Sequence, residues 1–563
     1  MKKYIIFLSL LLLPSLCFAG YSGSSPSWTS TADYTSLKGA YDSATEGDTI
    51  NVSSDSATWT SGQTLTITKG IHIIGATTGC PDACVDETVI TNGTVGGTYA
   101  ALFVINPANP ATTAVTEIEG LTLNLGDAGN GIWIQSTTDD YHSFRIHENH
   151  IYGGTSAGHY PVTAVGYTYG LLDHNLIEGS YMDLHISGNS QAGWDRYAES
   201  LDTDYSILWS ALGMGGLDFL YIEDNVFSGT THMIDDCGLG ARWVFRYNSI
   251  SLGSGALALW DIHGSTNNAG SIAVEIYENT ETVPSTSYSA YSNYLRIMNF
   301  SGGTAMLYDN VVQAKPSGAG PLWDINIGAS RQTDIACDYL RNGFQMKPRN
   351  SYFWGNTNST SGAGRVYFYR STSLGADPNS CLESGVHYWS DTNDNSKVEQ
   401  TGYAFSKQTT APATPVVGDV WWDTDDKLLY RCTAAGDWGT SVYTPLAYPH
   451  TLQGYTENQD ENYYLTVTKI GAGDGTVTSS GGSGSIDCGD TCQSNFTNND
   501  VVTLTATATG SDVFKGWSGE GCSGTGTCVV TMSAARNVVA EWQHSYVKSK
   551  AVFDDSGFKI VSQ

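Results

Sequence analysis

An apolar–polar alternation that ends in asparagine recurs along the chain and limits the folds open to it. "LYIEDN" ends at Asn225 and "WVFRYN" ends 23 residues later, at Asn248. Segments of the same kind end at Asn124, Asn149, Asn175, Asn279, Asn310 and Asn356. A repeat of this length, built from short strands and turns, is typical of a solenoid. The two long gaps, of 50 and 46 residues, are interpreted as double steps over a degenerate rung.

The alternation predicts which side chains form the core. Five and three residues before each asparagine the positions are mostly apolar, as in Trp243 and Phe245, and so is the position two residues after it, as in Ile250. Because side chains alternate along a strand, these positions should stack into one core, with the intervening positions facing solvent. The asparagine itself is expected to be a bend residue with left-handed dihedrals, whose amide bonds to the asparagine one rung away.

The first residues indicate export. Residues 1–19 combine Lys2 and Lys3 with an apolar run and small residues before Gly20, which predicts a signal peptide that is too short for a membrane span. Ten further cysteines follow, and in an oxidising compartment their spacing indicates local disulfides before metal sites. We expect a secreted or cell-surface protein with no membrane span.

The charge balance restricts the partners. The chain has 56 acidic and 26 basic residues and a formal net charge of −30. No basic footprint for nucleic acid is visible, so no nucleic-acid partner is expected. An acidic polysaccharide would be repelled unless cations or a local basic groove intervened.

A resemblance supports the solenoid. The segment "LKGAYDSATEGDTINVSS", followed by "TLTITKGIHIIGA", resembles the opening of right-handed parallel β-helix proteins of the pectate-lyase-like superfamily. There a capping helix precedes a Gly-Asp turn and the first rungs. The resemblance implies an all-β fold over residues 20–400, a right-handed parallel β-helix. It implies little about function, since the superfamily includes lyases, hydrolases, phage tailspikes and adhesins.

The rest of the chain is predicted to be a second β region. Residues 401–460 are interpreted as a linker and a small hairpin. Residues 461–543, with the core "FKGWSG…CSGTGTC", are similar to the internalin B-repeat-like bacterial repeat domain, which implies a small disulfide-containing β domain used for spacing or adhesion. Residues 544–563 are expected to be a C-terminal tail.

Two sets of residues are candidates for function. The first is aromatic: Tyr277, Tyr308, Tyr352 and Trp354 occupy positions predicted to face outward on neighbouring rungs, where they could stack on sugar rings. The same aromatics are also favoured in half-buried strands.

The second set is a histidine and aspartate cluster. His159, His232 and His263 each lie 16 residues before a repeat asparagine, and His185 keeps the same rung step. If the register holds, one face of neighbouring rungs carries the predicted catalytic set, His232, Asp235, Asp236, Arg242, Asp261 and His263.

The cluster suggests roles for each residue. His232 or His263 would act as a base, and Arg242 would stabilise charge. Asp235, Asp236 and Asp261 would act as acid or as ligands of calcium, the one cofactor that the residues suggest. The structural alternative is that these aspartates only bond to their own turns.

Two functions remain open. One is carbohydrate binding along the helix flank, with a polysaccharide or surface glycan as the partner and lyase or glycoside hydrolase activity at the cluster. The other is a non-catalytic cell-surface or adhesin-type structural protein. The cluster favours the first and the C-terminal domain favours the second.

Overall fold

The computed structural model divides the chain into two compact units, residues 1–453 and 454–563. The residues that it describes are 20–93, 101–107, 114–127, 129–136, 143–156, 158–166, 168–179, 182–188, 214–217, 219–230, 232–238, 240–253, 258–262, 270–282, 296–300, 303–313, 323–327, 340–341, 344–345, 350–358, 368–370, 384–385, 388–391, 403–454, 462–471, 473–488, 492–497, 500–519, 522–532, 536–544, 549–554 and 557–562.

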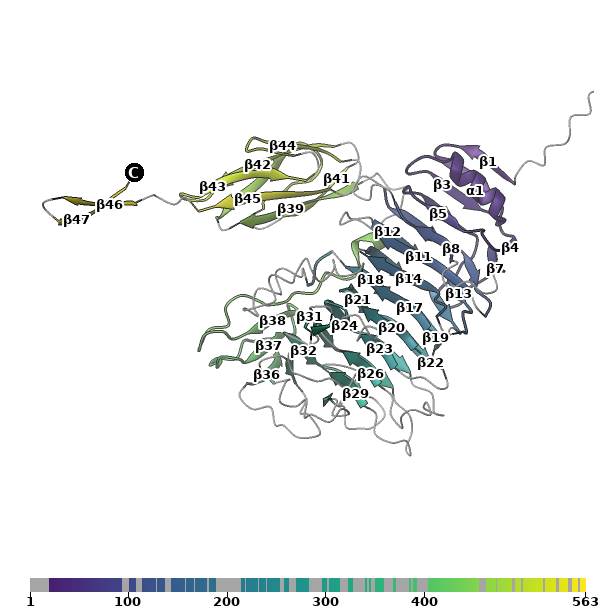
Figure 1. Cartoon of the computed structure of the whole chain (residues 1–563), viewed down its shortest axis with the longest axis horizontal. Coiled ribbons are helices and arrows are strands. Elements are labelled where there is room, and N and C mark those ends of the chain that lie inside the picture. Colours follow the sequence, from purple (N-terminus) through teal and green to yellow (C-terminus); the bar gives the residue numbers. More distant parts are fainter. Residues whose placement is uncertain are drawn as a thin grey trace, which may run out of the picture. The chain divides into compact units, whose positions relative to one another are not determined.

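Three sheets, A, B and C, wind through the first unit, and each turn of the chain adds one strand to each sheet (Figure 1). Sheet A contains β1 (Tyr21–Ser24), β2 (Ser27–Ser30), β3 (Thr49–Val52), β6 (His72–Ile74), β9 (Thr116–Glu119), β12 (Ser143–His147), β15 (Tyr169–Asp173), β18 (Leu220–Glu223), β21 (Arg242–Arg246), β24 (Ala273–Tyr277), β27 (Thr304–Tyr308), β32 (Ser351–Trp354) and β35 (Tyr388–Ser390).

Sheet B follows sheet A on each turn. Its strands are β4 (Ser56–Trp59), β7 (Val89–Asn92), β10 (Thr122–Asn124), β13 (His150–Tyr152), β16 (Leu176–Glu178), β19 (Val226–Thr230), β22 (Ser249–Leu252), β25 (Thr280–Thr282), β28 (Val311–Gln313) and β33 (Thr357–Asn358). Sheet C completes the turn with β5 (Leu65–Ile67), β8 (Ala101–Ile105), β11 (Asn130–Ser136), β14 (Val162–Gly166), β17 (Met182–Ser187), β20 (His232–Gly238), β23 (Ala258–Ile262), β26 (Arg296–Phe300), β29 (Trp323–Ile327) and β34 (Phe368–Arg370).

Only β1 and β2 pair antiparallel in these sheets; the later neighbours, such as β21 and β24, pair parallel. The predicted fold class is confirmed: an all-β, right-handed parallel β-helix is followed by a small disulfide-containing β domain. Helix α1 (Tyr34–Ser43) lies beside the first strands (Figure 1), where the Asp33 side chain caps it by accepting from the backbone N–H of Ser36. The helix buries Leu37, Ala40 and Tyr41 against the end of the core.

The predicted core positions are confirmed. Trp243, Phe245 and Ile250 are buried in one continuous core with the equivalent residues of the other rungs. Each rung contributes apolar side chains from all three sheets, so Ile234 and Trp260 of sheet C lie in the same core. Because each strand is only two to seven residues long, this shared apolar interior supplies most of what holds a rung in place.

The asparagine ladder is also confirmed, from Asn149 to Asn356. The Nδ2 and backbone N–H of each asparagine donate to Oδ1 of the next, as from Asn225 to Asn248, both at 3.0 Å. One detail of the prediction was wrong, because the left-handed residue is the one before the asparagine; Asp224, for example, has φ 58°. Asn124 is outside the ladder, since the N–H that donates to Asn149 belongs to Leu121.

The interpretation of the long gaps as double steps was wrong. β15 pairs directly with β18, although Asn175 and Asn225 are 50 residues apart. β27 likewise pairs directly with β32. The additional residues therefore lie between β17 and β18 and between β29 and β32, the latter containing the short hairpin β30 (Leu340–Arg341) and β31 (Phe344–Gln345). They are insertions at the passage from sheet C to sheet A.

The expectation that the outer positions of sheet A face solvent was wrong. Residues 403–453, here called the covering segment, lie over this face. They contain β36 (Phe405–Gln408), β37 (Val420–Asp423), β38 (Leu428–Arg431) and, at their end, the first three residues of the 3-10 turn η3 (Thr451–Gly454). A second core forms between them, in which Trp422 and Tyr443 pack against Tyr308 and Trp354. The aromatic residues proposed as a sugar platform are interior residues.

Removal of the Trp422 side chain should loosen the covering segment. Trp422 is buried and lies 4.9 Å from the Trp354 ring, so Trp422→Ala should lower the free energy of unfolding by about 3–5 kcal/mol. Trp438→Ala, at a half-buried tryptophan of the same segment, should cost clearly less. Denaturant unfolding measures both, and equal losses would contradict the packing described here.

The second unit is a small β domain. One of its sheets has the order β41 (Gln493–Thr497), β39 (Asn462–Gly471), β45 (Arg536–Gln543), β43 (Val513–Ser518), and the other β40 (Gly475–Ser480), β42 (Val501–Ala508), β44 (Cys528–Thr531). Both contribute to one core around Trp517 and Trp542. The hairpin of β46 (Ser549–Asp554) and β47 (Gly557–Ser562) follows.

The local disulfides expected from the sequence are present. They join Cys80 to Cys84, Cys488 to Cys492 and Cys522 to Cys528. Among the cysteines whose side chains are described, Cys432 is free and buried. In the described part of the chain, α1 with its 10 residues falls far short of a bilayer, and no other helix there has the length and apolarity to cross one.

Candidate functional site

One file of residues runs along sheet C, parallel to the helix axis. Register aligns Trp133 with Thr163, Thr163 with His185, and His185 with Asp235. Ile234 pairs with Trp260, so the residues that follow them, Asp235 and Asp261, come next to each other on adjacent strands. The file continues from Asp261 through Asn299 and Asn326 to Tyr369.

The described side chains of this file lie outside the core. Ile132, Ile134, Leu184 and Ile186, which flank Trp133 and His185 in sequence, are core residues. Because side chains alternate along a strand, Trp133 and His185 lie on the outer face, and both are half-buried. The His185 ring lies 5.0 Å from that of Tyr160, which precedes β14. Aromatic and imidazole groups therefore meet on this face.

An irregularity marks the middle of the file. The pairing of β17 with β20 shifts between His185 and Ser187, because Ser187 pairs with Gly238 instead of Cys237. β20 thus carries one extra residue next to the Asp235–Asp236 pair. Such bulges are frequent beside functional sites, where they redirect a side chain.

The other predicted site residues are placed as follows. His232 begins β20 and pairs with Met182 and Ala258, so it lies three positions from Asp235 along the strand. Asp236 follows Asp235 on β20, and Asp261 is on β23. For His232, Asp235, Asp236 and Asp261 the backbone is described and the side chains are not; His263 lies outside the described residues.

Arg242 belongs to another sheet. It begins β21 of sheet A, where its guanidinium donates to the Tyr169 hydroxyl at 2.5 Å and lies 5.4 Å from the centres of the Tyr169 and Phe219 rings. These aromatic contacts give Arg242 a packing role on sheet A.

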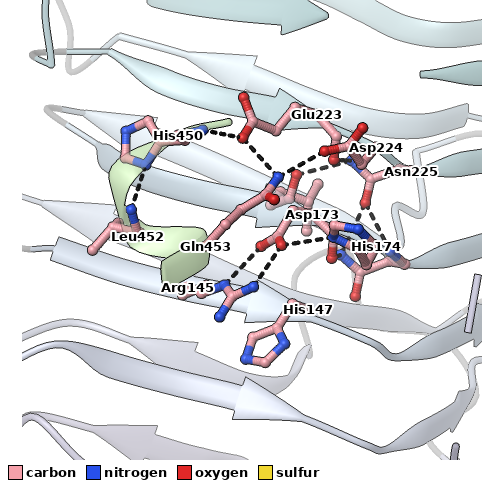
Figure 2. A network of polar contacts seen from close by, with 12 residues as sticks. Arg145, His147, Asp173, His174, Glu223, Asp224, Asn225, His450, Leu452 and Gln453 are labelled. Carbon is pink, nitrogen blue, oxygen red and sulfur yellow. Dashed lines mark hydrogen bonds and ion pairs between the residues drawn. The ribbon is translucent and has the colours of Figure 1, made fainter. Parts of the chain in front are cut away.

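The outer face of sheet A carries a buried ionic network beneath η3 and the residues before it (Figure 2). Arg145 donates to both carboxylate oxygens of Asp173, at 3.0 and 2.8 Å. Glu223 accepts from the backbone N–H of His450 at 2.7 Å and from Nε2 of Gln453 at 2.8 Å. Figure 2 shows Arg145 directed at Asp173 on the next rung, and Gln453 directed at Glu223 and Asp224 on the rung after it.

Arg246 is the centre of the next part of this network. It is fully buried, donates to Glu223 at 2.5 Å, to the Tyr277 hydroxyl at 2.8 Å, and to the backbone oxygens of Leu446 and Ala447 at 2.6 and 3.2 Å. Burial alone would lower the pKa of Arg246, but its interactions with Tyr277 and Glu223 outweigh burial and raise it. These groups attach the covering segment to the β-helix.

Burial sets the protonation of the neighbouring groups. It raises the pKa of Glu223 despite Arg246, and it raises the pKa of Glu275 despite hydrogen bonds from Tyr443 and Gly215. Burial and the charge of Arg246 lower the pKa of His450 to about 3, so this histidine is neutral. Asp173 differs, because hydrogen bonds from His174 and Arg145 lower its pKa against burial. The contacts of Glu223 and Arg246 join residues 446–453 to sheet A, so this part of the network stabilises the fold.

Reasoning from the sequence missed part of the file. Trp133, Tyr160, Asn299 and Asn326 were not singled out, and His185 was noted only for its spacing. Counting alternate positions on the strand that follows each sheet B strand would have found Trp133, Asn299 and Asn326. Tyr160 precedes β14 and is identified through its contact with His185.

No family model matches the chain, and no curated protein or solved structure is significantly similar to it.

Proposed function

We propose that this protein is an exported or cell-surface carbohydrate-binding protein that holds an extended glycan along the outer face of sheet C. The observation that carries the proposal is the register of sheet C, in which His185 and Asp235 are paired and Asp261 follows on the next strand. Strands stack about 4.8 Å apart, so such a file repeats along the axis as a glycan does along its chain. Half-buried Trp133 at one end offers a surface for a sugar ring.

The proposal includes a chemical step at the centre of the file. His185 or His232 would act as base, and Asp235, Asp236 and Asp261 as acid or as calcium ligands. The strand spacing of about 4.8 Å suits the close carboxylate pair of a retaining glycoside hydrolase better than the wider pair of an inverting one. Bound calcium would also offset the net charge of −30 and admit a uronate polysaccharide for a lyase reaction.

The resemblances noted in the sequence belong to the same proposal. The first unit would be a member of the pectate-lyase-like superfamily, and residues 461–543 an internalin B-repeat-like domain that spaces or anchors the β-helix. Cleavage of residues 1–19 as a signal peptide would deliver both to the cell exterior. The stacked parallel sheets and the three short-range disulfides support this arrangement.

Replacement of Asp235 and Asp261 by asparagine tests the proposal. The chain without residues 1–19 is screened for binding to neutral and uronate polysaccharides, with and without calcium. Asp235→Asn with Asp261→Asn should weaken binding to the retained polysaccharide more than about tenfold, because carboxylates are lost as hydrogen-bond acceptors and metal ligands. Ser249→Ala with Ser251→Ala, at exposed residues of sheet B, is the matched control and should bind normally.

Product formation separates the two functions. Unsaturated products, followed by ultraviolet absorbance, indicate a lyase, and new reducing ends alone indicate a hydrolase. Binding without either product supports the adhesin-type alternative. If no polysaccharide is retained, or if the aspartate variant binds as well as the control, the proposal is refuted.

A further inference from the structure

Two histidines and two glutamates converge on the outer face of sheet A, near its N-terminal end. His72 lies on β6, Glu117 and Glu119 on β9, and His147 on β12. The register pairs His72 with Glu117 and Glu119 with His147, so the four residues occupy three successive rungs. None of them belongs to the file on sheet C.

Ligand atoms of His72, Glu117 and His147 all lie within 4.8 Å of one another, which is close enough to share one ion, and Glu119 lies beside them. His147 Nε2 lies 2.7 Å from Glu117 Oε1 and 3.3 Å from Glu119 Oε2. His72 Nε2 lies 2.9 Å from Glu119 Oε1 and 3.6 Å from Glu117 Oε2. Nitrogen and oxygen ligands lie about 2.0–2.2 Å from zinc, so neighbouring ligands of a tetrahedral site are about 3.3 Å apart. The observed separations bracket that value.

Burial gives a second reason to expect an ion. His72, Glu117 and His147 are all more than nine-tenths buried, and Glu117 Oε2 has no hydrogen bond although it is enclosed and directed at His72. A buried carboxylate oxygen without a hydrogen bond costs about 1–3 kcal/mol or more. A cation between these groups would remove that cost.

The surrounding charges leave the cluster negative. Arg145 is the nearest guanidinium, but it binds Asp173 through two hydrogen bonds and is 3.5 Å from Glu117. Two imidazoles and a carboxyl group form a donor set that suits zinc and related divalent metals.

We propose that His72, Glu117 and His147 bind one divalent transition-metal ion of the zinc type. The ion ties β6, β9 and β12 together and so clamps three rungs of the β-helix. The histidines bind through Nε2 and Glu117 through one oxygen. Glu119, whose side chain is 21% exposed, lies at the side from which the ion enters.

Zinc binding by the whole exported chain tests the site. After treatment with a chelator, the chain without residues 1–19 is titrated with zinc chloride, and bound metal is counted by elemental analysis. One zinc per chain is expected. Cobalt in place of zinc should give the intense visible absorption of a tetrahedral site, which a purely structural charge network would not produce.

Variants locate the ion. His147→Ala and Glu117→Gln should each weaken zinc binding more than about tenfold, since even loss of a group behind a ligand costs about 10–100-fold. His150→Ala is the matched control, because His150 lies between Asp86 and Glu178 on sheet B and is outside the cluster. Unchanged binding in the cluster variants, or loss in the control, would place the metal elsewhere and overturn the proposal.

A measurement on the unaltered chain guards against variants that fail to fold. Exchange of the imidazole C2 protons is followed for each histidine by mass spectrometry, with and without zinc. Zinc should change the exchange of His72 and His147 and leave that of His150 as it was. Absence of any zinc-dependent change at His72 and His147 would refute the site directly.

Discussion

Asn225→Ala should lower the free energy of unfolding of the β-helix by about 3–5 kcal/mol. Asn225 is 1% exposed, and its side chain takes part in five hydrogen bonds. Its Oδ1 accepts from the backbone N–H and Nδ2 of Asn175, both at 3.0 Å. Its Nδ2 donates to the backbone oxygens of Leu172 and Glu223, at 2.8 and 3.0 Å, and to Asn248.

The expected loss of stability is large because alanine leaves the hydrogen-bonding partners of the Asn225 amide unpaired. The N–H of Asn175 and the C=O of Leu172 stay buried and lose the amide as their partner, and each such group costs about 1–3 kcal/mol. Asn51→Ala is the control, since Asn51 is exposed and its amide bonds are at 3.3 Å, and it should change stability by no more than about 0.5 kcal/mol. Urea unfolding of both variants measures the two changes in the free energy of unfolding. Similar losses in the two would mean that the ladder does not hold the rungs.

Arg246→Met should cost about 3–5 kcal/mol at neutral pH. Methionine keeps most of the volume but leaves Glu223 buried without its counter-charge, and it releases the backbone oxygens of Leu446 and Ala447. The covering segment should then be cut more rapidly by protease between residues 440 and 453. Lys38→Met, at an exposed pair with Asp42, is the control and should cost no more than about 0.5 kcal/mol.

The loss in Arg246→Met should depend on pH with a definite sign. The pKa of Glu223 already lies above its ordinary value of 4.5 because of burial, and removal of Arg246 raises it further. A carboxyl whose folded pKa is raised favours folding below its unfolded pKa, and that contribution is lost as pH rises through the folded value. The deficit should therefore be smallest near pH 4.5 and grow toward neutral pH. Adding Glu223→Gln should restore part of the stability at neutral pH, and a pH-independent deficit would contradict this account.

Local patterns predicted the solenoid well, for a physical reason. The alternation of side chains along a strand and the position of the asparagine are both visible within the sequence of one rung. The core positions of Trp243 and Phe245 and the ladder position of Asn248 could therefore be predicted from a few residues. The left-handed residue was misplaced by one because Glu148, Tyr247 and Glu278 are not residue types that favour such a conformation, whereas asparagine is.

The burial of the outer face of sheet A could not be read from the sequence. Arg246 contacts Leu446 across 200 residues, and Tyr443 donates to Glu275 across 168. No local periodicity reports which surface a distant segment will cover, so Tyr308 and Trp354 had the pattern of an exposed aromatic row. They lie in a second core instead.

The candidate site was predicted in part. Asp235 and Asp261 were identified, and the register brings them together. The distance of each histidine from the next repeat asparagine, however, predicted His263 as the neighbour of His232, and this was wrong. The register pairs His232 with Ala258, five residues before His263. Rung length varies, and the extra residue in β20 changes the register again, so offsets counted from an asparagine do not carry across to sheet C.

Radical footprinting with a bound glycan tests the central claim, that sheet C is the binding face. The polysaccharide retained most strongly in the binding screen is added at saturation, and oxidation of aromatic and imidazole side chains is mapped by mass spectrometry. Trp133, Tyr160 and His185 should be protected, while Tyr448, 46% exposed beside sheet A, should react as before. Protection of Tyr448 with unchanged oxidation of Trp133, Tyr160 and His185 would contradict the account.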